Sequence, residues 1–232
     1  METKKNININ NKACFLYETE SPSSILIQAI DEHDLEVLDS EVSKIKELSN
    51  EKFILLAFLV DNWNDDMSPW VAPAVFGNEN FGGKAHKTLE YVECSLLPYL
   101  QEKYGSGKKL YIGGYSLSAL FALWACYNTD IFDGVAAASP SMWFPNFTKY
   151  ASENDIKVNN VYLSLGKKEE KAKNKIMATV GDNIREYYDM LSEDNTNKVI
   201  LEWNDGNHFV DSDLRTAKGF AWIMSQVNNT IK

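Results

Sequence analysis

The sequence predicts an α/β fold in which helices cover both faces of a mostly parallel sheet. Short apolar runs alternate with amphipathic segments of helical length along the chain. One run, 53–60, is apolar throughout, which is typical of a central strand buried on both faces. No repeat, low-complexity segment or long linker interrupts the 232 residues, so we expect a single domain over residues 1–232.

Apolar periodicity places the individual elements. Apolar residues at 35, 38, 42, 45 and 48 have helical spacing, and Gly105 closes a second long helical segment. The expected helices are 35–48, 86–104, 117–127, one within 169–191, and 214–227. The expected strands are 13–18, 24–30, 53–60, 109–112, 134–138, 161–165 and 199–203. Functional groups of such a sheet lie in the loops that follow its strands. Here those loops are 61–85, 113–116, 139–150, 166–170 and 204–212.

The composition excludes several classes of partner. A net charge of −10 repels phosphate backbones and anionic lipids, so we expect no nucleic-acid partner and no membrane partner. The N-terminus lacks the apolar run of a secretory signal, and no apolar run is long enough to cross a bilayer. We therefore expect a cytoplasmic protein, either a monomer or a homodimer.

The three cysteines, Cys14, Cys94 and Cys126, are widely spaced, and we interpret the context of each as apolar, although Glu and Ser flank Cys94 directly. Their spacing matches no metal-binding pattern of cysteine and histidine. We therefore expect three reduced, packed thiols and no metal site.

Residues 110–120 read Leu-Tyr-Ile-Gly-Gly-Tyr-Ser-Leu-Ser-Ala-Leu, so a strand runs into glycines, a serine and then an apolar helix. This is the layout of a nucleophile elbow, G-x-S-x-G, with Ser116 as the nucleophile and Gly114 two residues before it. Ser118 stands where the motif has its second glycine, and we interpret this small residue as a tolerated departure. The alternative interpretation of Ser116 is a helix N-cap.

A serine hydroxyl becomes a nucleophile when a neighbouring base removes its proton. Of the three histidines, only His208 follows Ser116 in the chain, and it lies just after the last expected strand. In α/β hydrolases the order along the chain is serine, acid, histidine. The sequence thus predicts His208 as the general base, whereas His33 and His86 are interpreted as surface residues.

The acid that orients the imidazole should follow a strand between the serine and the histidine. The best loop reads Gly166-Lys167-Lys168-Glu169-Glu170, where we expect Glu169 to be the acid and keep Glu170 as the alternative. Both glutamates could instead belong to the charged start of a solvated helix. Two weaker substitutes for the acid are Asp155 and Asp182.

Acyl transfer also needs backbone N–H donors for the developing oxyanion. We expect one donor at Leu117, directly after the nucleophile, and the other at Trp63, or failing that at Asn62. Aromatic residues near the site loops are candidates for an apolar substrate pocket or for packing over the sheet edge. They are Trp63, Trp70, Tyr115, Trp143, Phe144 and Phe209.

With these pieces placed, the chain resembles the putative esterase family of α/β hydrolases. That family includes enterochelin-type siderophore esterases and S-formylglutathione hydrolase-like enzymes. The resemblance rests on the segments 61–70, 113–118, 138–144, 165–169 and 206–208, in this order. It implies a single-domain α/β-hydrolase fold and hydrolysis of small-molecule carboxylic esters without a cofactor, with Ser116 as nucleophile and His208 as base. The loops are short, so we expect no large lid.

The predicted function is therefore a serine hydrolase that cleaves carboxylic esters through an acyl-enzyme. Two other hypotheses remain open at this stage. One is an acyltransferase or thioesterase that uses the same triad. The other is a non-catalytic binding protein with this fold, which the missing glycine at Ser118 would favour.

Overall fold

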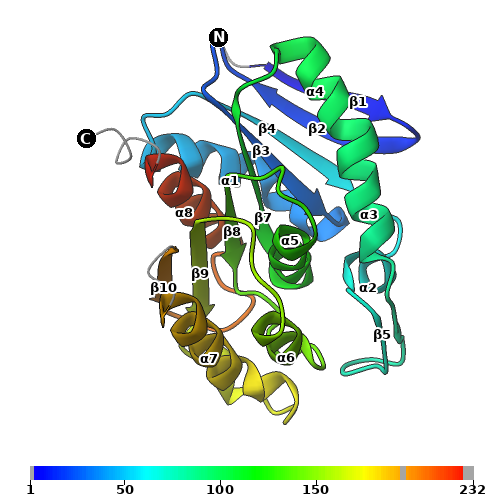
Figure 1. Ribbon diagram of the computed structural model, residues 1–232, viewed down its shortest axis with the longest axis vertical. Coiled ribbons are helices and arrows are strands. Elements are labelled where there is room, and N and C mark those ends of the chain that lie inside the picture. The colour runs from blue at the N-terminus through cyan, green and yellow to red at the C-terminus, as the bar shows by residue number, and fades with distance from the viewer. Residues whose placement is uncertain (1–2, 194–196, 227–232) are drawn as a thin grey trace.

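The computed structural model describes residues 3–193 and 197–226, and its centre is one eight-stranded sheet (Figure 1). The strand order is β1-β2-β4-β3-β7-β8-β9-β10. Strands β1 and β2 pair antiparallel, as do β2 and β4, and every pair from β4 to β10 is parallel. The strands are β1 (Thr3–Ile9), β2 (Lys12–Glu18), β3 (Ser24–Ile30), β4 (Phe53–Leu59), β7 (Lys109–Tyr115), β8 (Gly134–Ala138), β9 (Asn160–Gly166) and β10 (Lys198–Asn204). The predicted α/β architecture with a mostly parallel sheet is confirmed.

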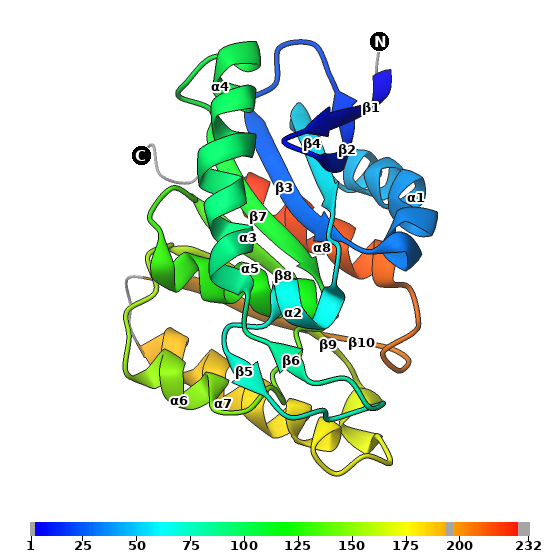
Figure 2. The same ribbon diagram turned by 90° about the vertical axis from the view of Figure 1, so that its right-hand side faces the viewer.

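Helices cover both faces of the sheet, as Figure 2 shows. Helices α1 (Glu32–Leu48) and α8 (Ser212–Ser225) pack together on one face, over the inward side chains of Leu26, Leu55 and Tyr111. The other face is covered by α3 (Ala85–Tyr91), α4 (Leu97–Tyr104), α5 (Ser116–Asn128), α6 (Phe147–Ser152) and α7 (Val180–Glu193). Side chains along each central strand alternate between these two cores, as the strand period of two requires.

The sequence did not predict strand β1, and its composition explains why. The strand is polar except at Ile7 and Ile9, because it lies at the sheet edge and pairs only with β2. Asn10 and Asn11 make the turn between the two strands, and both have the positive φ that asparagine tolerates. Lysines on an edge strand discourage pairing with other chains.

The helix expected over 86–104 is interrupted by one wide turn. Residues Val92–Leu96 form a π-helical turn, in which the N–H of Leu97 donates to the carbonyl of Val92. Pro98 follows at the start of α4, where its missing N–H is tolerated. Cys94 lies in this turn and is exposed, so the prediction of three packed thiols holds only for Cys14 and Cys126. Val92 and Leu96 face the core, which places Cys94 on the outer side of the helix.

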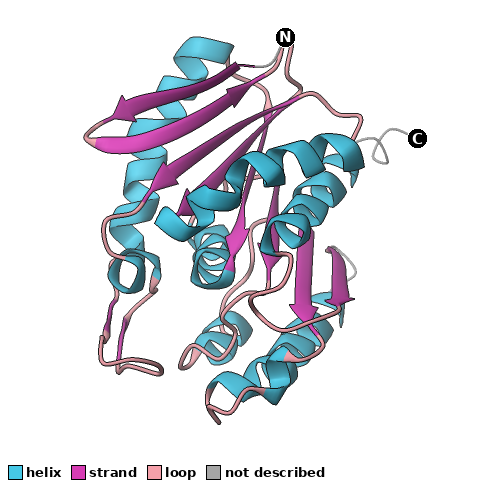
Figure 3. Cartoon of the chain, turned by 180° about the vertical axis from the view of Figure 1, so that it is seen from behind, coloured by secondary structure: helices cyan, strands magenta, loops and turns pink. Residues whose placement is uncertain are grey.

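Short elements follow strands β4 and β9. The segment after β4 forms α2 (Trp63–Met67) and then a small hairpin of β5 (Val71–Ala72) and β6 (Phe81–Gly82). The segment after β9 forms two 3-10 turns, Glu169–Lys171 and Met177–Thr179, before α7 begins. Seen from behind, the strands turn progressively from the β1 edge to the β10 edge (Figure 3), which is the usual twist of a sheet. None of the described helices is long and apolar enough to cross a membrane.

Candidate active site

The turn from β7 into α5 has the geometry of a nucleophile elbow. Tyr115 ends the strand in an extended conformation, and Ser116 begins the helix with a φ of 59°. A positive φ is uncommon outside glycine and tends to persist where function requires it. The neighbours of Ser116 on both sides are buried, whereas Ser116 itself is partly accessible. The turn therefore presents one hydroxyl to the solvent side of the sheet.

Ser118, which replaces the second glycine of the motif, fits the elbow. Its side chain is fully buried, and its hydroxyl donates to the carbonyl of Ala29 on β3 over 2.7 Å. The position of the elbow that cannot carry a side chain is Gly114, because a Cβ there would lie 2.3 Å from the Ser118 hydroxyl oxygen. The elbow thus keeps the glycine that it needs and uses Ser118 to tie α5 to the sheet.

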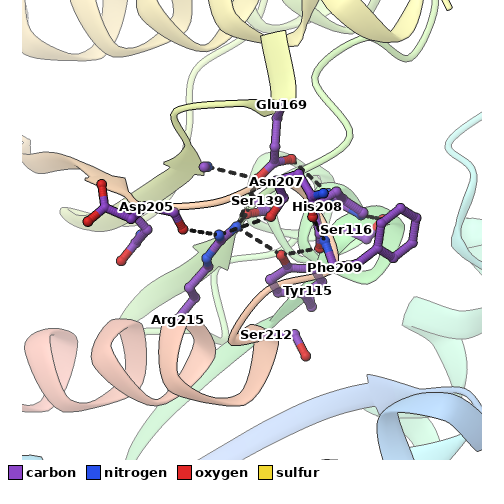
Figure 4. Close-up of polar contacts among 12 residues, drawn as sticks. Tyr115, Ser116, Ser139, Glu169, Asp205, Asn207, His208, Phe209, Ser212 and Arg215 are labelled. Atoms are coloured by element: carbon purple, nitrogen blue, oxygen red, sulfur yellow. Dashed lines mark hydrogen bonds and ion pairs between the residues drawn. The ribbon is translucent and has the colours of Figure 1, made fainter. Parts of the chain in front are cut away.

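Figure 4 shows His208 between Ser116 and Glu169. The Nε2 atom of His208 lies 2.9 Å from the Ser116 Oγ, and its Nδ1 atom lies 2.7 Å from Glu169 Oε2. A carboxylate can only accept, so Nδ1 carries the proton and donates to Glu169. Nε2 is then free to accept the hydrogen of the serine hydroxyl. The structure therefore brings together three residues that are far apart in the sequence and that were predicted to act together.

Glu169, rather than Glu170, faces the histidine. Its second oxygen, Oε1, accepts from the backbone N–H of Gly166 at 2.8 Å and from the Ser139 hydroxyl at 2.8 Å. The carboxylate of Glu170 instead lies 2.6 Å from Arg185. Asp182 also pairs with Arg185. The 3-10 turn directs two consecutive glutamates to different sides, which the sequence could not decide.

The environment of Glu169 favours its charged form. Burial by itself would raise the pKa of Glu169, but hydrogen bonds from His208, Gly166 and Ser139 oppose burial and hold the pKa below its ordinary value. The carboxylate therefore stays ionised beside the imidazole, where a negative charge can orient the ring and stabilise its protonated form.

Arg215 is a central residue of this site that the sequence analysis missed. It lies in the first turn of α8, is 1% exposed, and donates from Nη1 to Glu169 Oε1 at 2.9 Å. Its Nη2 donates to the backbone carbonyls of Asp205 and Asn207 at 2.9 and 3.0 Å. One guanidinium therefore holds both the acid and the loop that carries His208. A usable signal was that the chain contains only two arginines, and arginine is the cation best suited to a buried carboxylate.

Two further residues complete this network (Figure 4). The Tyr115 hydroxyl donates to the carbonyl of His208 at 2.7 Å and accepts from Arg215 at 3.1 Å. The Ser139 hydroxyl, which the sequence analysis did not single out, lies 3.1 Å from Arg215. Gly166 is required here, since a Cβ on it would fall 2.9 Å from both Arg215 Nη1 and Glu169 Oε1. Tyr115, expected among the substrate-binding residues, thus supports the histidine loop.

The two expected backbone donors lie at helix starts. Leu117 is in the first turn of α5 and Trp63 is in the first turn of α2, and these two helices are in contact. The N–H of Asn62, the alternative donor, already donates to the Asp66 carboxylate at 3.0 Å. Among the described residues, neither Leu117 nor Trp63 has an acceptor for its backbone N–H. Trp63 is therefore better placed than Asn62 to serve as a donor.

A cavity of about 420 Å³ opens beside His208. Trp143 lines it, as expected, whereas Phe144 and Trp70 do not. Phe144 is buried against Trp70 and Phe81, and Trp70 donates its indole N–H to the carbonyl of Pro145. The irregular 139–147 segment turns Phe144 inward, and Trp70, which precedes β5, packs against it. Among the described residues, no cluster of histidine, cysteine and acidic side chains could hold a metal ion.

Gly114→Ala tests the tight packing of the elbow. The added Cβ would meet Ser118, so we expect a loss of about 1–3 kcal/mol in the free energy of unfolding. Ser118→Gly removes the two closest atoms, so the double variant should lose less than the sum of the single variants. Urea unfolding of all four proteins measures this coupling. Strictly additive losses would argue against the contact.

Arg215→Met tests the buried ion pair. It leaves the Glu169 carboxylate buried without its cation, so we expect a loss of about 3–5 kcal/mol. Adding Glu169→Gln should recover part of that loss, because the neutral amide needs no cation. Arg185→Met is the matched control, since its ion pairs are exposed and should contribute about 1 kcal/mol or less. Equal losses from the two arginine variants would contradict the assignment.

Glu169→Gln tests the lowered pKa through acid stability. A carboxyl whose folded pKa is lowered stabilises the protein above its ordinary pKa of 4.5, and this stabilisation is lost as the pH falls through the folded pKa. We therefore expect the stability advantage of the wild type over Glu169→Gln to shrink below pH 4.5. Urea unfolding across the acid range measures it, with Glu170→Gln as the control for removal of one carboxylate. An advantage that grew on acidification would disprove the sign.

Comparisons with known proteins place the chain in a family. A family model described as "Putative esterase" matches residues 46–204, which is more than half of the chain. No curated protein sequence shows a significant match. Many solved structures have the same fold at low sequence identity.

Three of these structures illustrate the likeness. An IroE-like serine hydrolase from Shewanella oneidensis is 14% identical, with a TM-score of 0.76 over 96% of this chain and 79% of the other. The siderophore hydrolase EstA from Aspergillus nidulans is 15% identical, with a TM-score of 0.70 over 97% and 94%. The enterobactin esterase FES from Shigella flexneri is 12% identical, with a TM-score of 0.66 over 97% and 60%. At these identities the likeness shows the fold, and the family model shows the class: the chain belongs to the esterase family of α/β hydrolases, the carboxylic ester hydrolases that the sequence resembled.

Proposed function

We propose that this esterase hydrolyses small carboxylic esters through an acyl-enzyme formed on Ser116, with His208 as general base and Glu169 as the orienting acid. The observation that carries the proposal is the continuous hydrogen-bonded chain from Ser116 Oγ to His208 Nε2 at 2.9 Å and from His208 Nδ1 to Glu169 at 2.7 Å. Its position on a strained turn after a central parallel strand supports a reactive rather than a structural role.

In the first half of the reaction, the Ser116 oxygen attacks the ester carbonyl carbon while His208 Nε2 takes the hydroxyl proton. The backbone N–H groups of Leu117 and Trp63 are the proposed donors to the oxyanion. The carbon–oxygen bond to the alcohol then breaks, and His208 returns the proton to the leaving alkoxide. The products of this half-reaction are a free alcohol and the acyl ester of Ser116.

In the second half, water replaces the alcohol. His208 removes a proton from the water molecule, the resulting hydroxide attacks the acyl carbon, and the bond to Ser116 breaks as the proton passes to its oxygen. The carboxylic acid leaves and ionises in solvent. No electron transfer is involved, so the reaction balances with ester and water alone.

Arg215 acts in this scheme as a positioning residue. It does not reach the reacting atoms, but it fixes the carboxylate of Glu169 and the carbonyls at 205 and 207 in one frame. The imidazole can then keep a single tautomer and a fixed orientation through both proton transfers. Small errors in such alignment reduce rates strongly, so loss of this buried arginine is expected to lower the rate of ester hydrolysis.

Ser116→Ala tests the assignment of the nucleophile. We expect ester turnover to fall by about 10⁴-fold or more, because the residual rate would come only from substrate binding and oxyanion stabilisation. A fluorophosphonate should label the wild type at Ser116, as mass spectrometry of the peptide would record. Ser141→Ala is the matched control, since the Ser141 hydroxyl lies 3.4 Å from that of Ser116. The reagent should not label Ser141 in the wild type, and the Ser141→Ala variant should still be labelled at Ser116. Labelling that survived Ser116→Ala would refute the proposal.

A further inference from the structure

The segment that carries Glu169 is unusually basic for this chain. Residues 167–175 read Lys-Lys-Glu-Glu-Lys-Ala-Lys-Asn-Lys, which puts five lysines into a protein whose net charge is −10. The segment follows β9 and runs along the mouth of the cavity beside His208, where Lys168 and Lys171 form part of its lining. Basic residues are therefore concentrated beside the cavity that adjoins His208.

The acidic residues of the same segment do not neutralise these lysines. Glu169 is directed inward to His208 and Arg215, and Glu170 is paired with Arg185 at 2.6 Å. Lys167 pairs with Asp205 on the exposed surface. Within the part of the chain that the structure describes, Lys168 and Lys171 form no ion pair, and both are exposed. Lys168 and Lys171 therefore line the cavity without a direct ion pair, although the Asp205 carboxylate is close enough to interact with the charge of Lys168.

The rest of the cavity is apolar. Its walls include Pro140, Trp143, Met177 and Val180. Phe209 also lines it, is 85% exposed, and stands against His208 with ring centroids 5.6 Å apart (Figure 4). Burial of this exposed ring is favourable in free energy, and an apolar group bound in the cavity would bury it.

We propose that the substrate is an amphiphilic ester that carries a carboxylate: its apolar part lies against Trp143, Met177 and Phe209, and its carboxylate faces Lys168 and Lys171. This inference rests on the proposed function of Ser116. The chain as a whole is acidic, so the lysines of 167–175 give a local attraction for anions, which raises the local concentration of an anionic substrate. Lysine suits this task because its flexible stem lets one ammonium follow carboxylates at different distances from the ester.

The test compares esters that differ only in the charge. One pair is the para-nitrophenyl monoester of adipic acid and para-nitrophenyl hexanoate, whose acyl chains end in a carboxylate or a methyl group. A second pair, the acetyl esters of para-hydroxybenzoate and of its methyl ester, places the charge on the alcohol side. The readout is the ratio of kcat/KM for the anionic ester to that for the neutral ester, in the wild type and in the double variant Lys168→Gln/Lys171→Gln.

In at least one pair we expect this ratio to fall by about fivefold to tenfold in the double variant, which is the size expected for two exposed ion pairs. Turnover of the neutral ester should stay within about twofold, since neither lysine takes part in the chemistry, and added salt should weaken the wild-type preference. Lys52→Gln/Lys108→Gln is the matched control, because these lysines precede β4 and β7 at the opposite end of the sheet. An unchanged ratio in both pairs, or an equal fall in the control, would overturn the inference.

A binding measurement separates this inference from the proposed function. In Ser116→Ala, monoethyl adipate should change the intrinsic tryptophan fluorescence at lower concentration than ethyl hexanoate, and the lysine double variant should abolish that difference. The signal should be lost when Trp143→Phe is added, because Trp143 is the tryptophan among the cavity's lining residues. Equal binding of the two esters would overturn the carboxylate site even if neutral esters are hydrolysed. Loss of all turnover and of fluorophosphonate labelling in the wild type would instead remove the proposed function and leave the binding result to stand on its own.

Discussion

The carboxylate of Glu169 is the group around which the site is built. It is buried, and burial of a charge is costly unless the charge is paired and hydrogen-bonded. Here both conditions are met, because its two oxygens accept from His208, Gly166, Ser139 and Arg215. Those four donors come from four separate segments of the chain. The need to satisfy one carboxylate therefore fixes the relative positions of the loops that follow β8, β9 and β10 and the start of α8.

The parallel sheet makes this convergence possible. Strands β7, β8, β9 and β10 run in the same direction, so the loops after them meet at one edge although they are distant in sequence. The elbow after β7 places Ser116 at the same edge. The close fit of Gly114 against Ser118 holds α5 against the sheet. Ser118 also bonds to Ala29 on β3, so the helix behind the serine is anchored to two neighbouring strands. Rigidity of this kind would suit the proposed proton transfers, because the hydrogen bonds that they need span only 2.9 Å and 2.7 Å.

Much of the fold and of the candidate site could be predicted from local sequence, and the predictions that were wrong or incomplete have identifiable physical causes. The proximity of Ser116 and His208 was predictable, because a strand, a turn and an apolar helix surround the first, and the second is the only histidine after it. Glu169 and Glu170 could not be separated, since the choice depends on which way a 3-10 turn points each side chain.

Arg215 was missed because its partners are backbone carbonyls and residues of other segments, which leave no pattern around it. Phe144 and Trp70 were assigned to the pocket on proximity in sequence, but irregular segments have no periodicity from which the direction of a side chain follows. The polar edge strand β1 was missed for a related reason: apolar patterning marks what is buried, and an edge strand buries little.

The charges of the site divide into two groups that obey different physics. Glu169 and Arg215 lie in the interior, where the interaction is little screened by salt and where geometry, not concentration, decides its strength. Lys168 and Lys171 stand in solvent, where their effect is weak, long in range and sensitive to ionic strength. In the proposed function, Glu169 and Arg215 keep the reacting groups in place when a substrate arrives. The two lysines are proposed to select among substrates without disturbing that alignment. Glu169 lies between Lys168 and Glu170 in one short segment, so a single loop after β9 carries both groups of charges. Glu169 is directed inward to His208, and Lys168 and Lys171 are the exposed residues that we propose attract an anionic substrate.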